Sequence, residues 1–584
     1  MARQKRICGA ISAGSGKSTA RFSGPSAGWS ARAPVIRIRL ARIEASINVA
    51  ARMYLPGPSP RAWVSSTRGR WYQSGAKVVN QRARCAVALA LILGGSAGCQ
   101  DGQLPPGAFV VALASEPQSL DPRFGTDANS ARLADLLHVG LTRPDMAARR
   151  VPELAASWEF VNATTVVFRL RSQFHFADGR PVTAADVQAT YAAVLDPALA
   201  SPKRMSLAMI SRIEAPDPAT VVMRLREPFA PFLDATGLGI LPADRAHEPG
   251  EVAVGAGPFR LLSATRGERL VLAPNPGYPG GPPHLDPLVV RIVPDEVVRT
   301  LELYRGGVHL TEDSPQPEML DWLGSRPDLT VERTPGTSFD YLALNLRDPR
   351  LADRRVREAI AASLDRESLL RFVLGGAGRP ASGLLAPEHW AYAPARVPRH
   401  DPKRARRLLD RAGYRDPDGP GPLPRFRLVY KTSTQPGARR LAETIQAELA
   451  TVGIALDVRT YEWGTLYADV RSGNFQVCAL AWVGVGDPDL YYLAFDSTMQ
   501  PPAGYNRGGY ANPVMDRLTR RGRQLLDPAG RRAVYARVQR RAAHDLPVVP
   551  LWWEDRLVVH TRRLRGFEPA PDGNLRSLAT TWME

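Results

Sequence analysis

The sequence predicts an α/β protein, because strand-like and helix-like segments alternate from residue 107 onward and one region forms a complete strand–helix–strand unit. In that region, residues 425–432, 438–453 and 454–463 indicate a strand, an amphipathic helix and a second strand in succession. A connection of this length favours a crossover between parallel strands, which is typical of α/β folds. The helix has an apolar stripe on one face, and Gly453 provides its C-terminal stop.

Three further segments carry their own local signals. Residues 164–176 alternate apolar and charged side chains, which predicts a half-buried strand. Residues 182–195 follow the helical period and begin at a threonine that suits the N-cap position. Residues 353–376 contain two successive helices, for which Asp353 and Asp365 are the expected caps.

The charge distribution argues against a nucleic-acid role for the main body. The chain of 584 residues has a net charge of +19, but residues 1–84 alone hold 16 Lys or Arg and one acidic residue, a net charge of +15. Only +4 is left for the remainder. The basic excess that would attract nucleic acid or an anionic membrane therefore belongs to the first segment.

The cysteines and histidines, which could bind a metal or act in catalysis, do not have the spacing of a known metal-binding motif. Four cysteines, Cys8, Cys85, Cys99 and Cys478, provide neither a disulfide framework nor a CxxC metal site. None of the nine histidines lies three or four residues from another, which excludes a helical HExxH zinc motif. We therefore expect no metal, no cofactor and no catalytic residues.

A secretion signal is predicted at residues 78–98. Two arginines, an apolar core and a run of small residues precede Cys99, and the apolar run is too short to span a membrane. The segment "SAGC" resembles the cleavage box of bacterial lipoproteins, with Ser96 in place of the usual leucine. The resemblance implies a lipid on Cys99 and a lipidated stalk at 99–106. Ordinary soluble secretion is the alternative.

A signal has to lead the exported chain, so residues 1–77 are expected to be a non-native or disordered N-terminal extension. The natural start would then be Val78 or Val79. Within the extension, residues 13–19 ("AGSGKST") resemble a phosphate-binding loop. Ile11 occupies the position of its first glycine, so no nucleotide site is expected.

The order of several segments resembles one family, the large extracellular solute-binding proteins of peptide-type ABC importers. The segments include "ASEPQSLDP" (114–122), "FHFADGRPVTAADVQATY" (174–191), "YLALNLRDPRLADRRVREAIAASLDRESLL" (341–370), "FQVCALAWVGVGDPDLYY" (475–492) and "LPVVPLWWEDRLVV" (546–559). Each segment alone is weak evidence for the resemblance, but together, in this order, the segments cover nearly the whole chain after the signal peptide.

The resemblance implies a two-lobed, type II-like α/β fold of the large cluster, with the ligand cleft between the lobes. The chain would cross between the lobes near 329–346 and 546–560. Closure of the lobes around the ligand would present the protein to a membrane permease. The implied bounds are lobe 1 at 107–335, with a subdomain inserted at about 145–205, lobe 2 at 336–550, and a return to lobe 1 at 551–584.

The implied function is that of the substrate-binding component of an ABC transporter. It would capture peptides or peptide-like solutes in the periplasm or at the cell surface, as a monomer tethered to the membrane by the lipid on Cys99. Its partners would be the solute and the permease subunits, with no nucleic acid. Two alternatives are an exported hydrolase with a dispersed active site and a solute-sensing regulator. The regulator would need an N-terminal helix-turn-helix, and residues 1–80 contain no clean helix pair.

Peptide-type members hold the α-amine of the ligand with an aspartate that follows a Trp-containing strand. Here "AWVGVGDPD" (481–489) is one residue shorter than the same segment of the family's dipeptide binder, and Val485 occupies the position of that aspartate. Asp487 remains nearby, in the Asp-Pro turn that is common in the family. Either Asp487 replaces the missing carboxylate, or the ligand is not a standard peptide.

Aromatic and polar side chains near this turn complete the expected site. Trp482 and Tyr491 would form aromatic walls of the cleft or belong to the core. Arg507 would pair with a carboxylate of the ligand or be a solvated surface charge. Together with Asp487, the predicted ligand-binding residues are Phe339, Tyr341, Trp482, Tyr491, Asn506 and Arg507.

Overall fold

The computed structural model describes residues 104–584, except 249–253, 313–314 and 420. These residues belong to one compact unit, Gln100–Glu584. The predicted signal peptide, the extension before it and Cys99 lie outside the described residues. Among the helices of the described part, none combines the length and the apolar character needed to cross a membrane.

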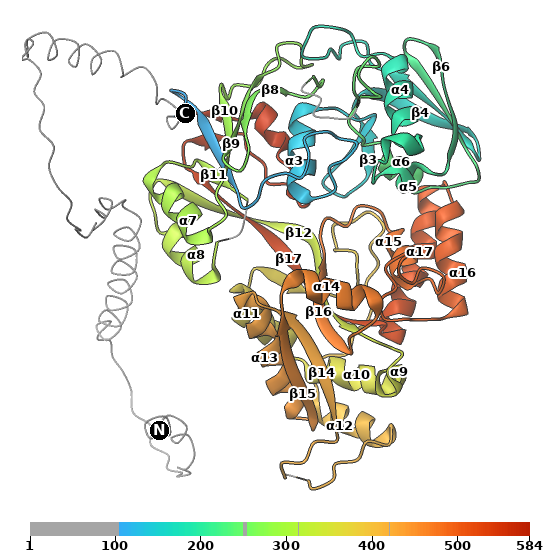
Figure 1. Cartoon of the computed structure of the whole chain (residues 1–584). Coiled ribbons are helices and arrows are strands. Elements are labelled where there is room, and N and C mark those ends of the chain that lie inside the picture. Colours follow the sequence, from blue (N-terminus) through green and yellow to red (C-terminus); the bar gives the residue numbers. More distant parts are fainter. Residues whose placement is uncertain (1–103, 249–253, 313–314, 420) are drawn as a thin grey trace, which may run out of the picture. The chain divides into compact units, whose positions relative to one another are not determined.

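Eleven strands form one large mixed sheet, in the order β15-β14-β16-β12-β17-β11-β1-β10-β9-β8, with β13 beside β17 (Figure 1). Their bounds are β1 (Phe109–Leu113), β8 (Phe259–Thr265), β9 (Arg269–Pro274), β10 (Leu288–Ile292), β11 (Leu310–Thr311), β12 (Leu329–Leu344), β13 (Gly378–Pro380), β14 (Phe426–Ser433), β15 (Ile454–Tyr461), β16 (Val477–Trp482) and β17 (Val548–Thr561). The predicted α/β class is confirmed, because helices cover both faces of this sheet.

The helices follow between these strands. Their bounds are α3 (Ala128–Leu137), α4 (Ala184–Leu195), α5 (Arg204–Leu207), α6 (Phe232–Ala235), α7 (Glu296–Arg305), α8 (Pro317–Gly324), α9 (Pro349–Ala352), α10 (Arg354–Ser363), α11 (Arg366–Leu374), α12 (Pro402–Arg411), α13 (Pro436–Ala450), α14 (Trp463–Ser472), α15 (Leu490–Phe495), α16 (Pro513–Gln524) and α17 (Pro528–Asp545), with short 3₁₀ helices η1 (Pro197–Leu199) and η2 (Arg576–Thr580).

Two long antiparallel strands, β12 and β17, run through the middle of the large sheet (Figure 1). One end of the pair is flanked by β11 and the other end by β16. We name the elements on the β11 side lobe 1 and those on the β16 side lobe 2. The ladder is interrupted between Thr334 and Ser338, so the three residues between them have no partner in β17. One of these is Gly336, where a Cβ atom would lie 2.3 Å from the Glu554 carbonyl oxygen.

Lobe 2 is a doubly wound sheet. Strands β14 and β15 are parallel, in register from Phe426–Ile454 to Ser433–Tyr461, which confirms the predicted crossover. Helix α13 packs on one face of this sheet and α14 on the opposite face. The second strand ends at Tyr461 and not at Trp463 as predicted, because Glu462 caps a helix there by accepting a hydrogen bond from the Gly464 amide.

Other local predictions for helices are also confirmed. Helices α10 and α11 begin after Asp353 and Asp365, whose carboxylates accept hydrogen bonds from backbone amides of the first turn. Helix α4 begins after Thr183, whose amide donates to Asp186 at 2.8 Å. In each case a short polar side chain satisfies groups that the helix terminus leaves unpaired.

Lobe 1 combines its part of the large sheet with a separate four-stranded antiparallel sheet, in the order β4-β5-β7-β6. The central strands of this small sheet have nearly the same sequence, TVVFRL in β5 and TVVMRL in β7, and each buries alternate residues. The bounds of the strands in the small sheet are β4 (Ala155–Asn162), β5 (Thr165–Leu170), β6 (Ile210–Asp217) and β7 (Thr220–Leu225). Two further sheets have two strands each: β2 (Thr142–Pro144) pairs with β3 (Arg150–Pro152), and β18 (Leu564–Arg565) pairs with β19 (Trp582–Met583). The small sheet thus continues past residue 205, the expected end of the inserted subdomain, because β7 supplies the second central strand.

A buried ion pair fixes the turn after β1. Arg123 has no exposed surface, and its guanidinium pairs with the Asp121 carboxylate at 2.6 Å. The same guanidinium donates to the carbonyl oxygens of Ala246 and Glu248. This single side chain therefore joins two segments of lobe 1 that are far apart in the sequence.

We expect Arg123→Met to lower the free energy of unfolding by about 3–5 kcal/mol, because it leaves the buried Asp121 carboxylate without a partner. Urea denaturation of the exported protein measures this loss. The matched control is Arg180→Met, which breaks an Asp-Gly-Arg pair of the same spacing on the surface. The account of the turn is wrong if both variants unfold at the same urea concentration as the unaltered protein.

Candidate ligand-binding cleft

The topology of lobe 2 creates a crevice at the carboxyl ends of its parallel strands. Helix α13 leaves the end of β14 toward one face and α14 follows β15 on the other face, so the two chains diverge at that edge. Ligands of doubly wound sheets bind at such a switch point. A cavity of about 830 Å³ lies there, lined by Thr432, Ser433 and Trp463 of lobe 2 and by Glu296 and Gln316 of lobe 1. We call this cavity the interlobe cleft.

A second cavity between the lobes has a volume of about 690 Å³. Lobe 2 contributes the loop Gly484–Gly486, and lobe 1 contributes residues around Arg143, Arg150 and Asp234. Val485, which occupies the position of the expected amine-binding aspartate, lines this cavity and is almost fully buried. The loop after the Trp-containing strand therefore presents an apolar side chain here instead of a carboxylate.

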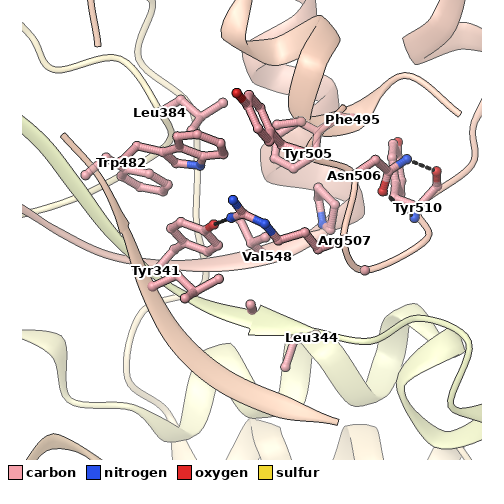
Figure 2. A pocket seen from close by; sticks show the side chains of 16 residues that line it. Tyr341, Leu344, Leu384, Trp482, Phe495, Tyr505, Asn506, Arg507, Tyr510 and Val548 are labelled. Carbon is pink, nitrogen blue, oxygen red and sulfur yellow. Dashed lines mark hydrogen bonds between the residues drawn. The ribbon is translucent and has the colours of Figure 1, made fainter. Parts of the chain in front are cut away.

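Five of the seven predicted ligand-binding residues line one small pocket within lobe 2, with a cavity volume of about 30 Å³ (Figure 2). Phe339 and Tyr341 come from β12, Trp482 from the end of β16, and Asn506 and Arg507 from the loop before α16. Residues 339 and 482 are direct partners in the antiparallel ladder, so their side chains share a face of the sheet.

Arg507 is held in a cage of aromatic side chains (Figure 2). Its guanidinium carbon lies 5.2 Å from the ring centre of Trp482, and 5.5 Å from those of Tyr467 and Tyr505. Its terminal nitrogens donate to the hydroxyls of Tyr341 at 3.3 Å and Tyr467 at 3.4 Å. No carboxylate of the described residues lies within ion-pairing distance. Arg507 thus combines cation–π contacts with a free charge.

Asn506 positions the loop that carries Arg507. Its side chain is 2% exposed, and its amide group donates to the carbonyl oxygens of Asp496 and Tyr510 while accepting from the Tyr510 amide. All the polar atoms of this side chain are therefore used within the loop. In lobe 2, burial also raises the pKa of Tyr341, so its hydroxyl stays neutral beside Arg507.

The structure places the other two predicted residues outside this pocket. Asp487 forms a two-pronged ion pair with Arg531 of α17, at 2.7 and 2.8 Å, and Arg531 is 6% exposed. Tyr491 is fully buried, and its hydroxyl accepts a hydrogen bond from the Leu384 amide. Both residues anchor the loop and α15 to the body of lobe 2. Their roles in ligand binding stay predictions.

Sequence reasoning missed three aromatic residues and two acidic ones around these cavities. Trp463 is 51% exposed at the start of α14 and stacks on Tyr467, and Tyr505 is also largely exposed. Asp340 and Glu554 lie on the crossing strands and line the interlobe cleft. The signal in the sequence that could have identified the acidic pair is a carboxylate within an otherwise largely apolar stretch of β12 and of β17.

Comparisons with known proteins identify the family. Residues 149–501 match the family described as bacterial extracellular solute-binding proteins, family 5 Middle. The di/tripeptide-binding protein 2 of Pseudomonas aeruginosa (strain UCBPP-PA14) is 30% identical over 527 residues, which cover 84% of this chain and 98% of the relative. The glutathione-binding protein GsiB of Escherichia coli (strain K12) is 28% identical over 482 residues, 79% of this chain and 92% of the relative.

Among solved structures, the periplasmic binding protein DppA of Helicobacter pylori in complex with the peptide STSA has a TM-score of 0.68 and 25% identity. The match covers 82% of this chain and 98% of that chain. The predicted two-lobed fold and the family resemblance are confirmed. The chain belongs to the bacterial extracellular solute-binding proteins of family 5.

Proposed function

We propose that this protein is the substrate-binding component of an ABC importer, which captures peptides or peptide-like solutes and delivers them to a membrane permease. The names of the relatives, which bind di- and tripeptides or glutathione, support this class of solute. The two cavities between the lobes provide the space where a solute of that size would lie, and one of them is lined by the loop Gly484–Gly486 that follows Trp482. No feature of the described residues favours an exported hydrolase or a regulator, and we infer no catalytic role.

The observation that carries the proposal is Arg507 in its aromatic cage. A guanidinium with no carboxylate partner offers paired donors to an anion, and the surrounding rings hold it in place without neutralising it. A peptide carries such an anion at its C-terminus. We infer that Arg507 binds a carboxylate of the solute, with Trp482 and Tyr505 as walls.

Closure of the lobes would link capture to delivery. Contacts that join lobe 1 to lobe 2 include the Glu318–Arg440 ion pair at 3.0 Å, and backbone hydrogen bonds from Trp390 to Ala147 and from Ala230 to Arg523. Such contacts stabilise the closed arrangement, and a solute that binds both lobes shifts the equilibrium toward it.

The proposed lobe bounds follow the crossing strands. The unpaired stretch of β12 between Thr334 and Ser338 coincides with the boundary expected at residues 335 and 336. It interrupts the ladder at the point where the chain leaves lobe 1. We infer that this stretch absorbs the change in backbone angles when the lobes move, with lobe 1 at 107–335, lobe 2 at 336–550 and the return at 551–584.

We also propose that the exported protein is a monomer anchored in the membrane by a lipid on Cys99, with its fold in the periplasm or at the cell surface. The small residues before Cys99 and the apolar core of the signal support lipid attachment. A family of extracellular binding proteins fits this location.

We expect Arg507→Gln to weaken binding of a tripeptide about tenfold or more, because a charge-assisted hydrogen bond contributes about 1.5–3 kcal/mol and each 1.4 kcal/mol is a factor of ten. Isothermal titration with a tripeptide and with its C-terminally amidated form measures the effect. The amidated peptide should bind the Gln variant and the unaltered protein equally well. Arg517→Gln, an exposed change on α16, is the control. An equal loss for both peptides would contradict the pairing of Arg507 with a carboxylate.

We expect Cys99→Ser to release the exported protein from the membrane fraction into the soluble fraction. Mass spectrometry of the unaltered exported protein should find Cys99 as its first residue, with diacylglycerol on the sulfur. Deletion of residues 1–77 should leave this product unchanged. A soluble, unlipidated product from the unaltered gene would show ordinary secretion instead.

A further inference from the structure

Two acidic side chains on the crossing strands face the interlobe cleft together. Ser338 pairs with Glu554 across the ladder, and Asp340 pairs with Trp552. Residues two apart on a strand share a face, so the side chains of Asp340 and Glu554 lie on the same side of the β12–β17 pair. Both residues line the interlobe cleft, the cavity of about 830 Å³. Neither forms an ion pair with any described residue.

The charge of Arg556 lowers the pKa of Glu554, but Arg556 is itself paired with Glu312 at 3.4 Å and forms no ion pair with the acidic pair. Arg440 is bound by Glu318 of the opposite lobe, and Asp555 is bound by Arg333 at 2.5 Å. Glu296 on α7 adds a further acid. The ionisable residues that line the cleft are Glu296, Glu318, Asp340, Arg440, Glu554 and Asp555.

Holding these carboxylates together costs free energy in the closed protein. One carboxylate oxygen of Asp340, Oδ2, is buried and accepts no hydrogen bond from the described residues. Burial raises the pKa of both carboxyl groups, and the charge of Glu554 raises that of Asp340 further. Two neighbouring, partly buried carboxylates that form no ion pair are typical of a site shaped for a ligand.

The chemistry of the surroundings indicates a nitrogen cation. No group of three or more metal-binding side chains occurs in the part of the chain that the structure describes, so a metal ion would lack ligands. An ammonium or guanidinium group needs only a few oxygen acceptors, which two carboxylates supply. The indole of Trp552 lies beside the pair, and that of Trp463 lines the same cavity, both suited to the carbon chain of an amine.

We propose that Asp340 and Glu554 form a cation-binding subsite of the interlobe cleft, which selects solutes that carry an amine or a guanidinium group. The inference rests on the proposed function and specifies its substrate class. The subsite lies on the crossing strands, away from the loop in which Val485 leaves no carboxylate. A solute bound there contacts the two strands that connect the lobes.

The test is native mass spectrometry of the exported protein with a mixed tripeptide library. Half of the peptides are N-acetylated, and half of each group contain lysine or arginine. The unaltered protein should enrich peptides with a positive charge about tenfold or more over acetylated peptides without one. Enrichment of acetylated lysine peptides identifies a side-chain cation as the ligand, and enrichment of free α-amines alone identifies the N-terminus.

The variants Asp340→Asn and Glu554→Gln should each abolish this enrichment, whereas Glu554→Asp, which keeps the charge, should retain it. Both neutral variants should also melt at a higher temperature, because they remove repulsion between buried charges. Glu443→Gln, an exposed acid on α13, is the control for net charge. Unchanged selection and unchanged melting in the neutral variants would overturn the subsite.

The outcomes separate the two proposals. Retention of the library without preference for charge overturns the cation subsite and leaves peptide binding intact. Failure of the unaltered protein to retain any peptide overturns the proposed function, and the subsite with it.

Discussion

The pairing of β12 with β17 is the constraint on which the rest of the structure depends. These two strands run from the part of the large sheet in one lobe into the part in the other, so they connect the lobes covalently and through their ladder. A continuous antiparallel ladder would hold the lobes rigidly. The unpaired residues between Thr334 and Ser338 interrupt it, a second register shift follows between Asp340 and Tyr341, and Gly336 allows the two backbones to approach closely at the first interruption. Connection and mobility are thus built into the same pair of strands.

Successive side chains of β12 point to opposite faces of the sheet, so the two faces of this strand have different roles. Phe339 and Tyr341 point toward the pocket of Arg507, whereas Asp340 between them points into the interlobe cleft. The alternate faces pack against different cores, one covered by α13 and the other by α14. A single segment can therefore present an aromatic wall to an anion-binding arginine and a carboxylate to the cavity on the opposite face.

Local patterns in the sequence predicted the helices, their caps and the parallel crossover, because these depend on neighbouring residues. The prediction failed at Trp463, where a glutamate cap competes with strand propensity and begins a helix. It also could not foresee that Asp487 is bound by Arg531, a contact between residues 44 positions apart. The residues that gather around Arg507, such as Tyr467 of α14 and Tyr505 of a loop, meet only through tertiary packing. The partners of a charge decide whether it is free for a ligand, and those partners are set by the fold.

The most direct test of the central claim is the distance between the lobes with and without a bound solute. Spin labels at Glu159→Cys in lobe 1 and Arg459→Cys in lobe 2, two exposed positions, report this distance by pulsed electron paramagnetic resonance. If the β12–β17 pair is a hinge and the cleft between the lobes holds the solute, saturation with a retained peptide should shift the distance distribution to shorter values. An unchanged distribution in the presence of bound peptide would contradict closure of the lobes around the solute.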